Sequence, residues 1–428
     1  MISNNSELTS KAITFFAWLK EYWPCLLILL TVIGFVSKSL YNYPMGVMAI
    51  IGFYRTICSP SIILGDKTHR TFLILFLCLW LPLLASFPDA VNQQHSAHTV
   101  FPYLRFLFAG LFIIQELSTN KKYIKIIINS VFFIVLFWCL DASIQFFVGK
   151  DLFGYPYRTG DITGMFYPRN RIAHICAILS PFYFLYIFKS KDSKKIAWLA
   201  LIPLFFIILL SGRRAAWLML ALSSAGFFVY YFLQLSNKKV VLKAISIICV
   251  VLGMVLASTI LLHEPTKARF KVTMGLFSGD YETIDIATAR RLPLWETAYD
   301  IFKSNPINGI GPRGFRYVFH NYAQPDSFWF NDLPQTHPHL LFLEIMTETG
   351  SIGIAGYFLF IFLVLKTLFF TKNNWGRFPL LLPVLIAILP INAHMAFYGS
   401  IWSTMTWWLT AVYFAFVRLQ TNEAKIQN

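Results

Sequence analysis

Residues 196–233 read IAWLALIPLFFIILLSGRRAAWLMLALSSAGFFVYYFL, two apolar runs joined by a short turn that carries Arg213 and Arg214. A helix needs about 20 mostly apolar residues to cross the hydrocarbon core of a membrane, and each run approaches that length. Because the connection is short, the two runs predict neighbouring antiparallel helices that span a membrane. The turn between them is the most basic part of the stretch.

The rest of the chain repeats this pattern. Of its 428 residues 57% are hydrophobic and only 13% are charged, a composition outside the range of soluble globular domains. Apolar runs occur near 22–38, 44–58, 71–87, 100–117, 124–148, 172–188, 196–211, 215–233, 244–262, 350–370, 379–397 and 401–418. The sequence therefore predicts an all-α integral membrane protein with about 12 transmembrane helices. We expect a membrane domain over 1–262, a long outer loop over 263–340, and a membrane domain with a short tail over 341–428.

Lys and Arg set the orientation of these spans. The formal charge of +16 is concentrated in alternate short connections, whereas the connections at 39–43, 88–99 and 398–400 contain neither Lys nor Arg. Basic short loops stay on the cytoplasmic side, so both termini are predicted to be cytoplasmic. The basic balance then reports topology and gives no reason to expect nucleic acid as a partner. Two outer connections break the rule, the loop 149–171 and the turn at Arg213.

The long loop has its own helical signals. Apolar residues at spacings of three and four predict one amphipathic helix from Ile286 to Ser304. The following stretch 305–315 is rich in Gly, Pro and Asn and predicts turns. A second helix is expected to begin near Pro338 and to run into the span at Gly350. These features predict a lid or platform on the outer membrane surface.

Ionisable residues lie near the outer ends of several spans, where burial is costly. Arg105 and Asp141 either form a buried ion pair between adjacent helices or serve catalysis directly. Arg171 is either an interfacial anchor or part of the site, and His174 is better explained by helix packing. All four positions point to the outer level of the membrane.

Two pairs of arginines stand out. Arg213 and Arg214 lie on the side that should exclude positive charge, which favours binding of a diphosphate by their forked guanidinium groups over interaction with lipid head groups. Arg290 and Arg291 open the predicted loop helix, where the helix dipole does not favour them and a nearby anion would relieve them. A solvated helix end explains the second pair equally well.

His337 and His339 precede the late span in the order His-Pro-His. No third Cys, His or carboxylate ligand stands beside them, and the six cysteines form no CxxC pair, so no metal site is predicted. A general base is the more plausible role for a histidine here, because imidazole titrates near neutral pH. Glu344 and Glu348 either orient a histidine or line the helix.

Three of these segments resemble motifs of O-antigen ligases and polymerases. Ser211-Gly-Arg-Arg-Ala-Ala-Trp217 resembles the family's Ser-Arg-Gly-Ala-Trp turn. Arg291-Leu-Pro-Leu-Trp-Glu296, followed by Phe302-Lys-Ser-Asn-Pro-Ile-Asn-Gly-Ile-Gly311, looks like the family's outer-loop pattern. His337-Pro-His-Leu-Leu-Phe-Leu-Glu344 looks like its histidine element before a late span. The three occur in the family's order over roughly residues 160–360.

The resemblance implies roles for particular residues. By register Arg214 and Arg291 match the family arginines, and His339 matches the family histidine. Arg213, Arg290 and His337 are then neighbours whose roles stay open. Leu340 replaces the Asn that usually follows the histidine, and Gly-Arg replaces the usual residues before Arg214.

The resemblance also implies an activity, a fold and a location. The expected protein is a GT-C-like glycosyltransferase of the bacterial inner membrane whose active site faces the periplasm. It moves a polysaccharide from undecaprenyl diphosphate to lipid A–core in lipopolysaccharide biosynthesis, by inverting displacement and without a metal or other cofactor. His339 is the expected base, and Arg214 and Arg291 the expected diphosphate ligands. An O-antigen polymerase is the nearest alternative, and a transporter of lipid-linked glycans is the alternative from another class.

Overall fold

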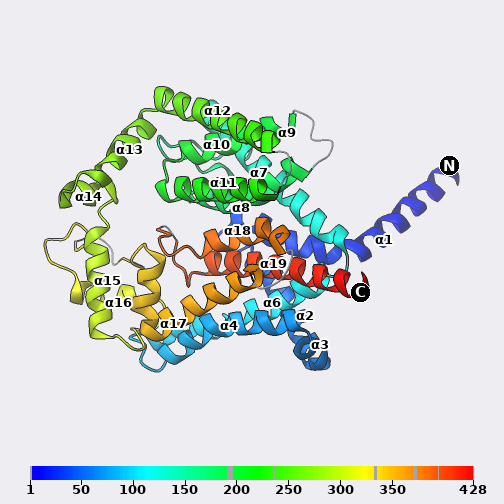
Figure 1. Cartoon of the computed structure of the whole chain (residues 1–428), viewed down its shortest axis with the longest axis horizontal. Coiled ribbons are helices and arrows are strands. Elements are labelled where there is room, and N and C mark those ends of the chain that lie inside the picture. The colour runs from blue at the N-terminus through cyan, green and yellow to red at the C-terminus, as the bar shows by residue number, and fades with distance from the viewer. Residues whose placement is uncertain are drawn as a thin grey trace.

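The computed structural model describes residues 2–189, 196–234, 238–331, 335–369, 374–393 and 395–427, and these residues form an all-helical protein without strands (Figure 1). The first half contains α1 Ile2–Ile33, η1 Gly34–Val36, α2 Asn42–Cys58, α3 Pro60–Gly65, α4 Lys67–Ser86, α5 Gln93–Val100, α6 Leu104–Leu117, α7 Lys121–Val148, η2 Gly164–Phe166, α8 Ile172–Lys189, α9 Ile196–Leu199 and α10 Leu201–Leu210. The second half contains α11 Arg214–Gln234, α12 Lys238–Leu262, α13 Glu264–Met274, η3 Gly275–Phe277, α14 Tyr281–Ala287, α15 Leu292–Ser304, α16 Phe315–Tyr322, α17 Leu341–Phe369, η4 Asn374–Arg377, α18 Phe378–Ala387 and α19 Ser400–Gln427.

Many of these helices are built to cross a membrane. Within the part of the chain that the structure describes, six segments are long and apolar enough to do so: Phe16–Val36, Lys67–Ser86, Gln93–Leu117, Lys121–Val148, Arg214–Gln234 and Leu341–Leu368. Ile172–Phe188, Ala197–Leu210 and Phe378–Ala387 are shorter apolar helices. In a bilayer a helix satisfies all its backbone polar groups internally, which is why apolar runs of this length fold as helices. The protein is therefore a multi-pass membrane protein, as its composition predicts.

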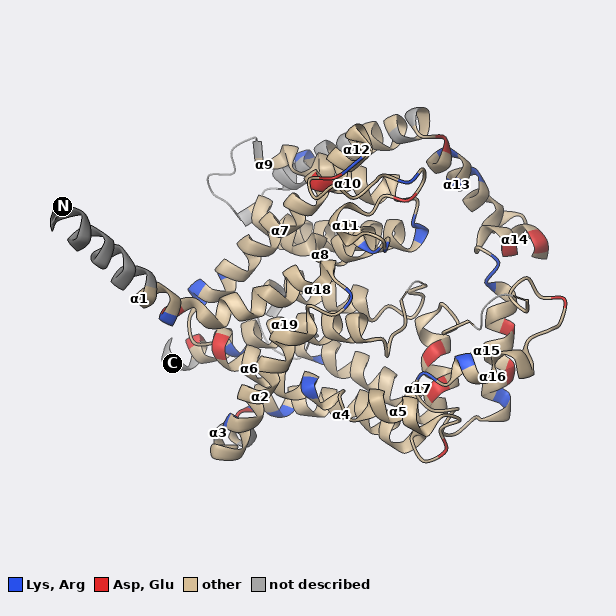
Figure 2. Cartoon of the chain, turned by 180° about the vertical axis from the view of Figure 1, so that it is seen from behind, with Lys and Arg blue, Asp and Glu red and all other residues tan. Residues whose placement is uncertain are grey.

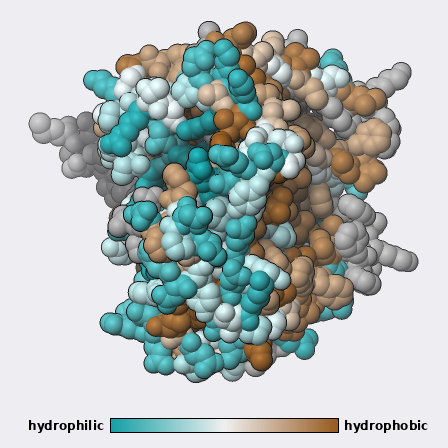
Figure 3. Space-filling model, turned by 90° about the vertical axis from the view of Figure 1, so that its left-hand side faces the viewer, coloured by the Kyte–Doolittle hydropathy of each residue, from teal (hydrophilic) through white to brown (hydrophobic). Residues whose placement is uncertain are grey.

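The helices pack as a bundle with two ends. α6 lies against α2 and α19, α4 packs on α17, and α8 packs between α7 and α11. Both termini lie at one end of the molecule, and α13 to α16 lie at the other (Figure 2). Seen from that second end, hydrophilic residues cover much of the face and hydrophobic residues gather along one side (Figure 3). The arrangement separates a polar end from an apolar body.

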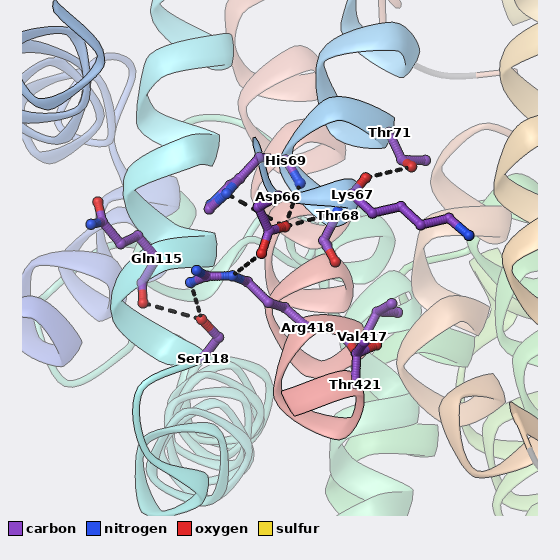
Figure 4. A network of polar contacts seen from close by, with 10 residues as sticks. All are labelled: Asp66, Lys67, Thr68, His69, Thr71, Gln115, Ser118, Val417, Arg418 and Thr421. Atoms are coloured by element: carbon purple, nitrogen blue, oxygen red, sulfur yellow. Dashed lines mark hydrogen bonds and ion pairs between the residues drawn. The ribbon is translucent and has the colours of Figure 1, made fainter. Parts of the chain in front are cut away.

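A polar network fastens the end that carries the termini (Figure 4). Asp66 caps α4, because its Oδ1 accepts hydrogen bonds from the N–H groups of Thr68 and His69 at 2.8 and 3.1 Å. Arg418 of α19 donates from Nε to Asp66 Oδ2 at 3.0 Å and from Nη1 to Ser118 Oγ at 2.8 Å. One guanidinium thus joins the ends of α4, α6 and α19.

The predicted run at 379–397 is only half helical. α18 ends at Ala387, three residues ahead of Pro390, a residue that disfavours a helix interior because it lacks an N–H group. Asn392 donates from Nδ2 to the carbonyl oxygens of Ile386 and Ala387 at 2.8 and 3.1 Å and so caps the end of α18. The described residues 388–393 and 395–399, between α18 and α19, are irregular.

The prediction of a single loop helix from Ile286 to Ser304 is wrong. The structure has α14 to Ala287 and α15 from Leu292, separated by a turn in which Ala289 and Arg290 adopt left-handed backbone angles, with φ of 64° and 56°. The Asp285 carboxylate accepts a hydrogen bond from the N–H of Leu292 at 3.0 Å and so caps α15. This side-chain hydrogen bond stabilises a break at residues 288–291, where the apolar spacing predicted a continuous helix.

The helix expected near Pro338 starts at Leu341 and continues to Phe369, so it and the span predicted from Gly350 are one element, α17, with a kink at Gly350 (φ 62°). The kink leaves the carbonyl oxygens of Thr347 and Glu348 unpaired within the helix. They accept hydrogen bonds from the N–H groups of Ile310 and Gly311, both at 3.0 Å. Two backbone hydrogen bonds thus hold the turn-rich stretch 305–315 against α17.

Candidate active site

A cavity of about 890 Å³ lies at the end of the molecule that carries α13 to α16. Its walls come from the turn between α10 and α11, from α13 and η3, from the segment 287–295, and from Leu340, Ile391 and Ala393. Segments distant in sequence meet here, because α13 and α14 connect the α10–α12 helices to the α15–α17 region (Figure 1).

Four arginines line the cavity, namely Arg213, Arg214, Arg269 and Arg291, and no acidic residue stands among the described residues that form its walls. Three of these four are site residues predicted from the sequence. Arg290, which the sequence also predicted, does not line the cavity. Its guanidinium lies 5.0 Å from the centre of the Phe328 ring and 4.0 Å from Asp285 Oδ2. The left-handed turn explains this split between neighbours, because it sends adjacent side chains in different directions.

A hydrogen bond from Arg269 stabilises the turn Ser211–Arg214. Arg269 Nη1 donates to the carbonyl oxygen of Ser211 at 2.8 Å. Gly212 has φ of 62°, and a Cβ added there would lie 2.2 Å from that same nitrogen, so only glycine fits. Arg214 is the first residue of α11, where unpaired backbone N–H groups add positive potential. The turn therefore gathers three guanidinium groups beside a helix N-terminus.

The arginines differ in how they are held. Arg213 donates from Nη2 to Asp161 Oδ1 at 2.9 Å, and Asn170 donates to the same carboxylate oxygen. Arg214 Nη1 is buried and has no hydrogen-bond partner within the described part of the chain. Asp161 thus fixes one guanidinium while the next keeps donors available for a bound group.

Of the two predicted diphosphate ligands, Arg291 is more deeply buried than Arg214. Its Nη1 donates to the carbonyl oxygen of Ala393 at 2.5 Å. Burial, and then the nearby charges of Arg214 and Arg213, lower the pKa of Arg291 to about 10. Burial and Arg213 likewise lower the pKa of Arg269. A cluster whose members lower one another's pKa is one that an anion would stabilise.

His339 precedes α17 in a left-handed conformation, with φ of 52°. Its ring centre is 4.0 Å from that of His337, whose Nδ1 lies 2.9 Å from Thr336 Oγ1. Leu340, the next residue, lines the cavity, whereas His339 is not among the lining residues. The N–H of Leu341 donates to the carbonyl oxygen of Asn392 at 2.8 Å, which fixes the start of α17 against the segment that holds Arg291.

Glu344 and Glu348 have structural partners other than the histidines. Glu344 is buried and accepts from the N–H groups of Phe397 and Tyr398 at 2.8 and 3.2 Å. Glu348, also buried, accepts from the N–H of Arg313 at 2.7 Å. The two carboxylates anchor irregular segments onto α17, a role that neither sequence alternative anticipated.

Arg105, Arg171 and Asp141 lie outside the cavity walls. Asp141 accepts from the N–H groups of Leu152 and Met165 at 3.0 and 2.9 Å, and Arg105 donates to Ser400 Oγ at 2.8 Å. The ion pair considered for Arg105 and Asp141 is therefore wrong, because Asp141 binds the backbone of the loop 149–171 instead.

Sequence reasoning missed two residues of this region. Arg269 falls in a loop helix without a motif, and Asp161 falls in an irregular loop, so no spacing rule marks either. His174, expected to serve packing, lines the cavity, as do Trp217 and Trp295. Trp295 Nε1 is buried and without a partner in the described residues, so it offers one more donor.

The fold and the cavity define a multi-pass membrane protein with a strongly basic site at one end of its helical bundle. The chain carries a domain of the O-antigen ligase family: residues 199–358 match the family model described as O-Antigen ligase. This segment contains all four cavity arginines and both histidines of the third motif. No curated protein matches the chain.

Proposed function

We propose that this protein is an O-antigen ligase, which transfers a polysaccharide from undecaprenyl diphosphate to lipid A–core in lipopolysaccharide biosynthesis. The family implies transfer of lipid-linked glycans. The observation that carries the proposal is the cavity in which Arg213, Arg214, Arg269 and Arg291 meet without a carboxylate among the lining residues described.

The charge of this cluster fits a diphosphate. Burial, and then the charges of Arg214 and Arg213, lower the pKa of Arg291, so an anion beside this guanidinium would be favourable. A diphosphate brings negative charge and several acceptor oxygens, and forked guanidinium donors match them well. Arg214 and Arg291 are its main ligands in our proposal, and Arg269 is a third, added from the structure.

The apolar part of the cavity fits a lipid carrier. Trp217, Leu218, Leu276 and Trp295 line it beside the arginines. Nearby on η3, Phe277 is 83% exposed, as expected for a side chain that meets lipid. A polyprenyl chain would leave the cavity along such a surface while its diphosphate stays among the arginines.

The proposed chemistry is a direct displacement. His339 takes the proton of the acceptor hydroxyl, whose oxygen attacks the anomeric carbon of the donor sugar. The bond from that carbon to the diphosphate oxygen breaks, and undecaprenyl diphosphate leaves with the electron pair. Arg214 and Arg291 stabilise the charge that develops on the leaving group. One attack from the face opposite the leaving group inverts the anomeric carbon, and the guanidinium groups supply the positive charge without a metal.

The proposal includes a membrane arrangement. We assign about 12 spans in a GT-C-like fold of the bacterial inner membrane, with residues 1–262 and 341–428 as membrane domains. Residues 263–340 form the periplasmic part, and both termini are cytoplasmic. In support, the termini share one end of the bundle while α13 to α16 occupy the other (Figure 2).

Transfer by the purified protein tests the proposal. The assay contains undecaprenyl-diphosphate-linked glycan, lipid A–core and EDTA, and compares wild type with His339→Ala and Arg214→Ala. We expect a loss of about 10²-fold or more for each variant, and full activity for the control Lys303→Gln, an exposed cation of α15 that pairs with Asp300.

The other outcomes separate the alternatives. Lengthened donor without lipid A–core product would move the assignment to an O-antigen polymerase. Movement of the donor across a vesicle membrane without any transfer would identify a transporter. Full activity of both variants would reject the proposed site.

A further inference from the structure

A second basic pocket lies at the outer ends of α6 and α19 and shares no lining residue with the arginine cavity. Its volume is about 140 Å³, and its walls are mostly polar, with Arg105, Arg313, His98, Thr99, Ser400 and Ser403 among them. No Asp or Glu stands among the described lining residues. A pocket of this size accommodates a single small anionic group.

Arg105 enters this pocket with part of its hydrogen-bonding capacity unused. Its Nη2 donates to Ser400 Oγ at 2.8 Å, and the guanidinium lies 4.7 Å from the centre of the Phe106 ring. Its Nε is buried without a hydrogen-bond partner among the described residues, and the described lining of the pocket offers it no Asp or Glu. A half-buried cation without a counter-ion is unfavourable unless an anion joins it.

Arg313 reaches the same pocket from an unusual backbone position. It has φ of 65°, within Gly311-Pro-Arg-Gly314, where glycine would be unstrained. Its Nη1 is buried without a partner among the described residues. Glu344 and Glu348 lie near this arginine, but both are engaged by backbone N–H groups and neither lines the pocket. Strain of this kind persists where a side chain is needed.

We propose that this pocket binds a phosphate group on the sugar head group of the acceptor glycolipid. Two guanidinium groups with unused N–H donors and the hydroxyl of Thr99 line this pocket, whereas the hydroxyls of Ser400 and Ser403 already donate to Asn42 and to the carbonyl oxygen of Phe397. A carboxylate would bring only one charge to these two cations. A phosphate monoester has three terminal oxygens and up to two charges, so it satisfies this set better. The inference rests on the proposed function, because it names where the second substrate of that reaction is held.

The surroundings favour a lipid-anchored phosphate over a free one. Ser400 Oγ donates to Asn42 Oδ1, which places the pocket beside Tyr43, a side chain that is 69% exposed. Phe101, next to the lining residue Pro102, is 52% exposed. Exposed rings at the end of a membrane bundle suit the interface where a lipid head group sits.

The pocket and the arginine cavity are joined by one short segment. Ala393 accepts from Arg291 in the cavity, and Tyr398 lines the second pocket. Five residues of chain separate these positions by no more than about 18 Å. An acceptor head group of a few sugars can therefore keep its phosphate in one site while a hydroxyl reaches the other.

The experiment uses the full-length protein in nanodiscs and two lipid A–core preparations, one intact and one treated with a phosphatase. The variants are Arg105→Gln and Arg313→Gly, the latter chosen because glycine suits the left-handed backbone. Arg158→Gln, an exposed arginine of the outer loop 149–171, is the matched control. Binding of each glycolipid and the KM for each substrate are measured.

We expect each pocket variant to bind intact acceptor roughly tenfold or more weakly and to raise its KM by a similar factor. The KM for the donor and the behaviour of Arg158→Gln should not change. Dephosphorylated acceptor should bind wild type and the pocket variants equally weakly, and millimolar inorganic phosphate should displace little intact acceptor.

Equal losses with intact and dephosphorylated acceptor would overturn the inference, as would full displacement by inorganic phosphate. A wild-type protein that transfers no glycan would reject the proposed function. The binding measurement would still decide the pocket in that case, because it does not depend on transfer.

Discussion

At the scale of single residues, the candidate site is a set of arginines whose side chains have different hydrogen-bond partners. Arg213 is neutralised by Asp161, Arg291 is bound to a carbonyl oxygen, and Arg214 keeps a buried N–H group without a partner among the described residues. Three of the four cavity arginines could be predicted, because Arg213 and Arg214 break the alternation of basic and non-basic short connections and because the segments around Arg214 and Arg291 resemble family motifs. Arg269 could not, since its position follows only from the path of α13.

Arg269 provides the first prediction. Arg269→Ala removes both one cavity charge and the hydrogen bond to Ser211, so we expect kcat/KM to fall by about 10²-fold. Arg269→Lys keeps the charge but loses the forked geometry, and should recover part of that loss. Steady-state transfer assays of both variants measure this. Identical values for the two would show that charge has no part in the role of Arg269.

A second residue-scale prediction concerns pH. Burial, and then the charge of Arg269, lower the pKa of His263, which lies between α12 and α13 and hydrogen-bonds Thr266. The unfolded chain, with a histidine pKa of about 6.5, then binds more protons than the folded one. This stabilising contribution is complete above about pH 6.5 and is lost as pH falls through the lower folded value.

We therefore expect the wild-type protein to lose thermal stability between pH 7.5 and pH 5, and His263→Asn to lose less over the same interval. Unfolding in detergent, followed by intrinsic fluorescence at each pH, measures both. Parallel pH curves for the two proteins would remove His263 from the account.

At the scale of elements, periodicity found the helices but missed their breaks. Apolar runs predicted the spans because a membrane allows few alternatives to a helix. The breaks at 288–291, at Gly350 and after Ala387 depend on single hydrogen bonds, such as that of Asp285 with Leu292, and on contacts between distant segments. Such contacts leave no periodic signal in a sequence.

The kink in α17 gives the prediction at this scale. A Cβ at Gly350 would lie 2.1 Å from the carbonyl oxygen of Ile307, and φ is 62°, so Gly350→Ala should destabilise the protein by more than about 2 kcal/mol. Gly46→Ala in α2 is the matched control, because a Cβ there meets nothing within 4 Å. It should be neutral or stabilising by up to about 1 kcal/mol. Thermal unfolding compares the two, and equal midpoints would contradict the docking of Ile307, Ile310 and Gly311 on the kink.

At the scale of the whole molecule, the fold places a polar end opposite the end that holds the termini. The Asp66–Arg418 network closes one end, and α13 to α16 cover the other (Figures 2 and 4). In our assignment the first is cytoplasmic and the second periplasmic. Glu282→Cys on α14 should then react with a membrane-impermeant maleimide in cells whose outer membrane is permeable, while Asn422→Cys on α19 should not. Labelling of Asn422→Cys but not of Glu282→Cys would invert the topology.

The central claim is that the arginine cavity binds the diphosphate of a lipid carrier, and direct binding tests it most simply. Affinities of undecaprenyl diphosphate and of undecaprenol are compared for wild type and for Arg214→Ala/Arg291→Ala in nanodiscs. We expect wild type to prefer the diphosphate by about 10²-fold or more, from two charge-assisted contacts, and the double variant to lose most of that preference. Equal affinity of wild type for the two lipids, or a preference that survives in the double variant, would contradict the account.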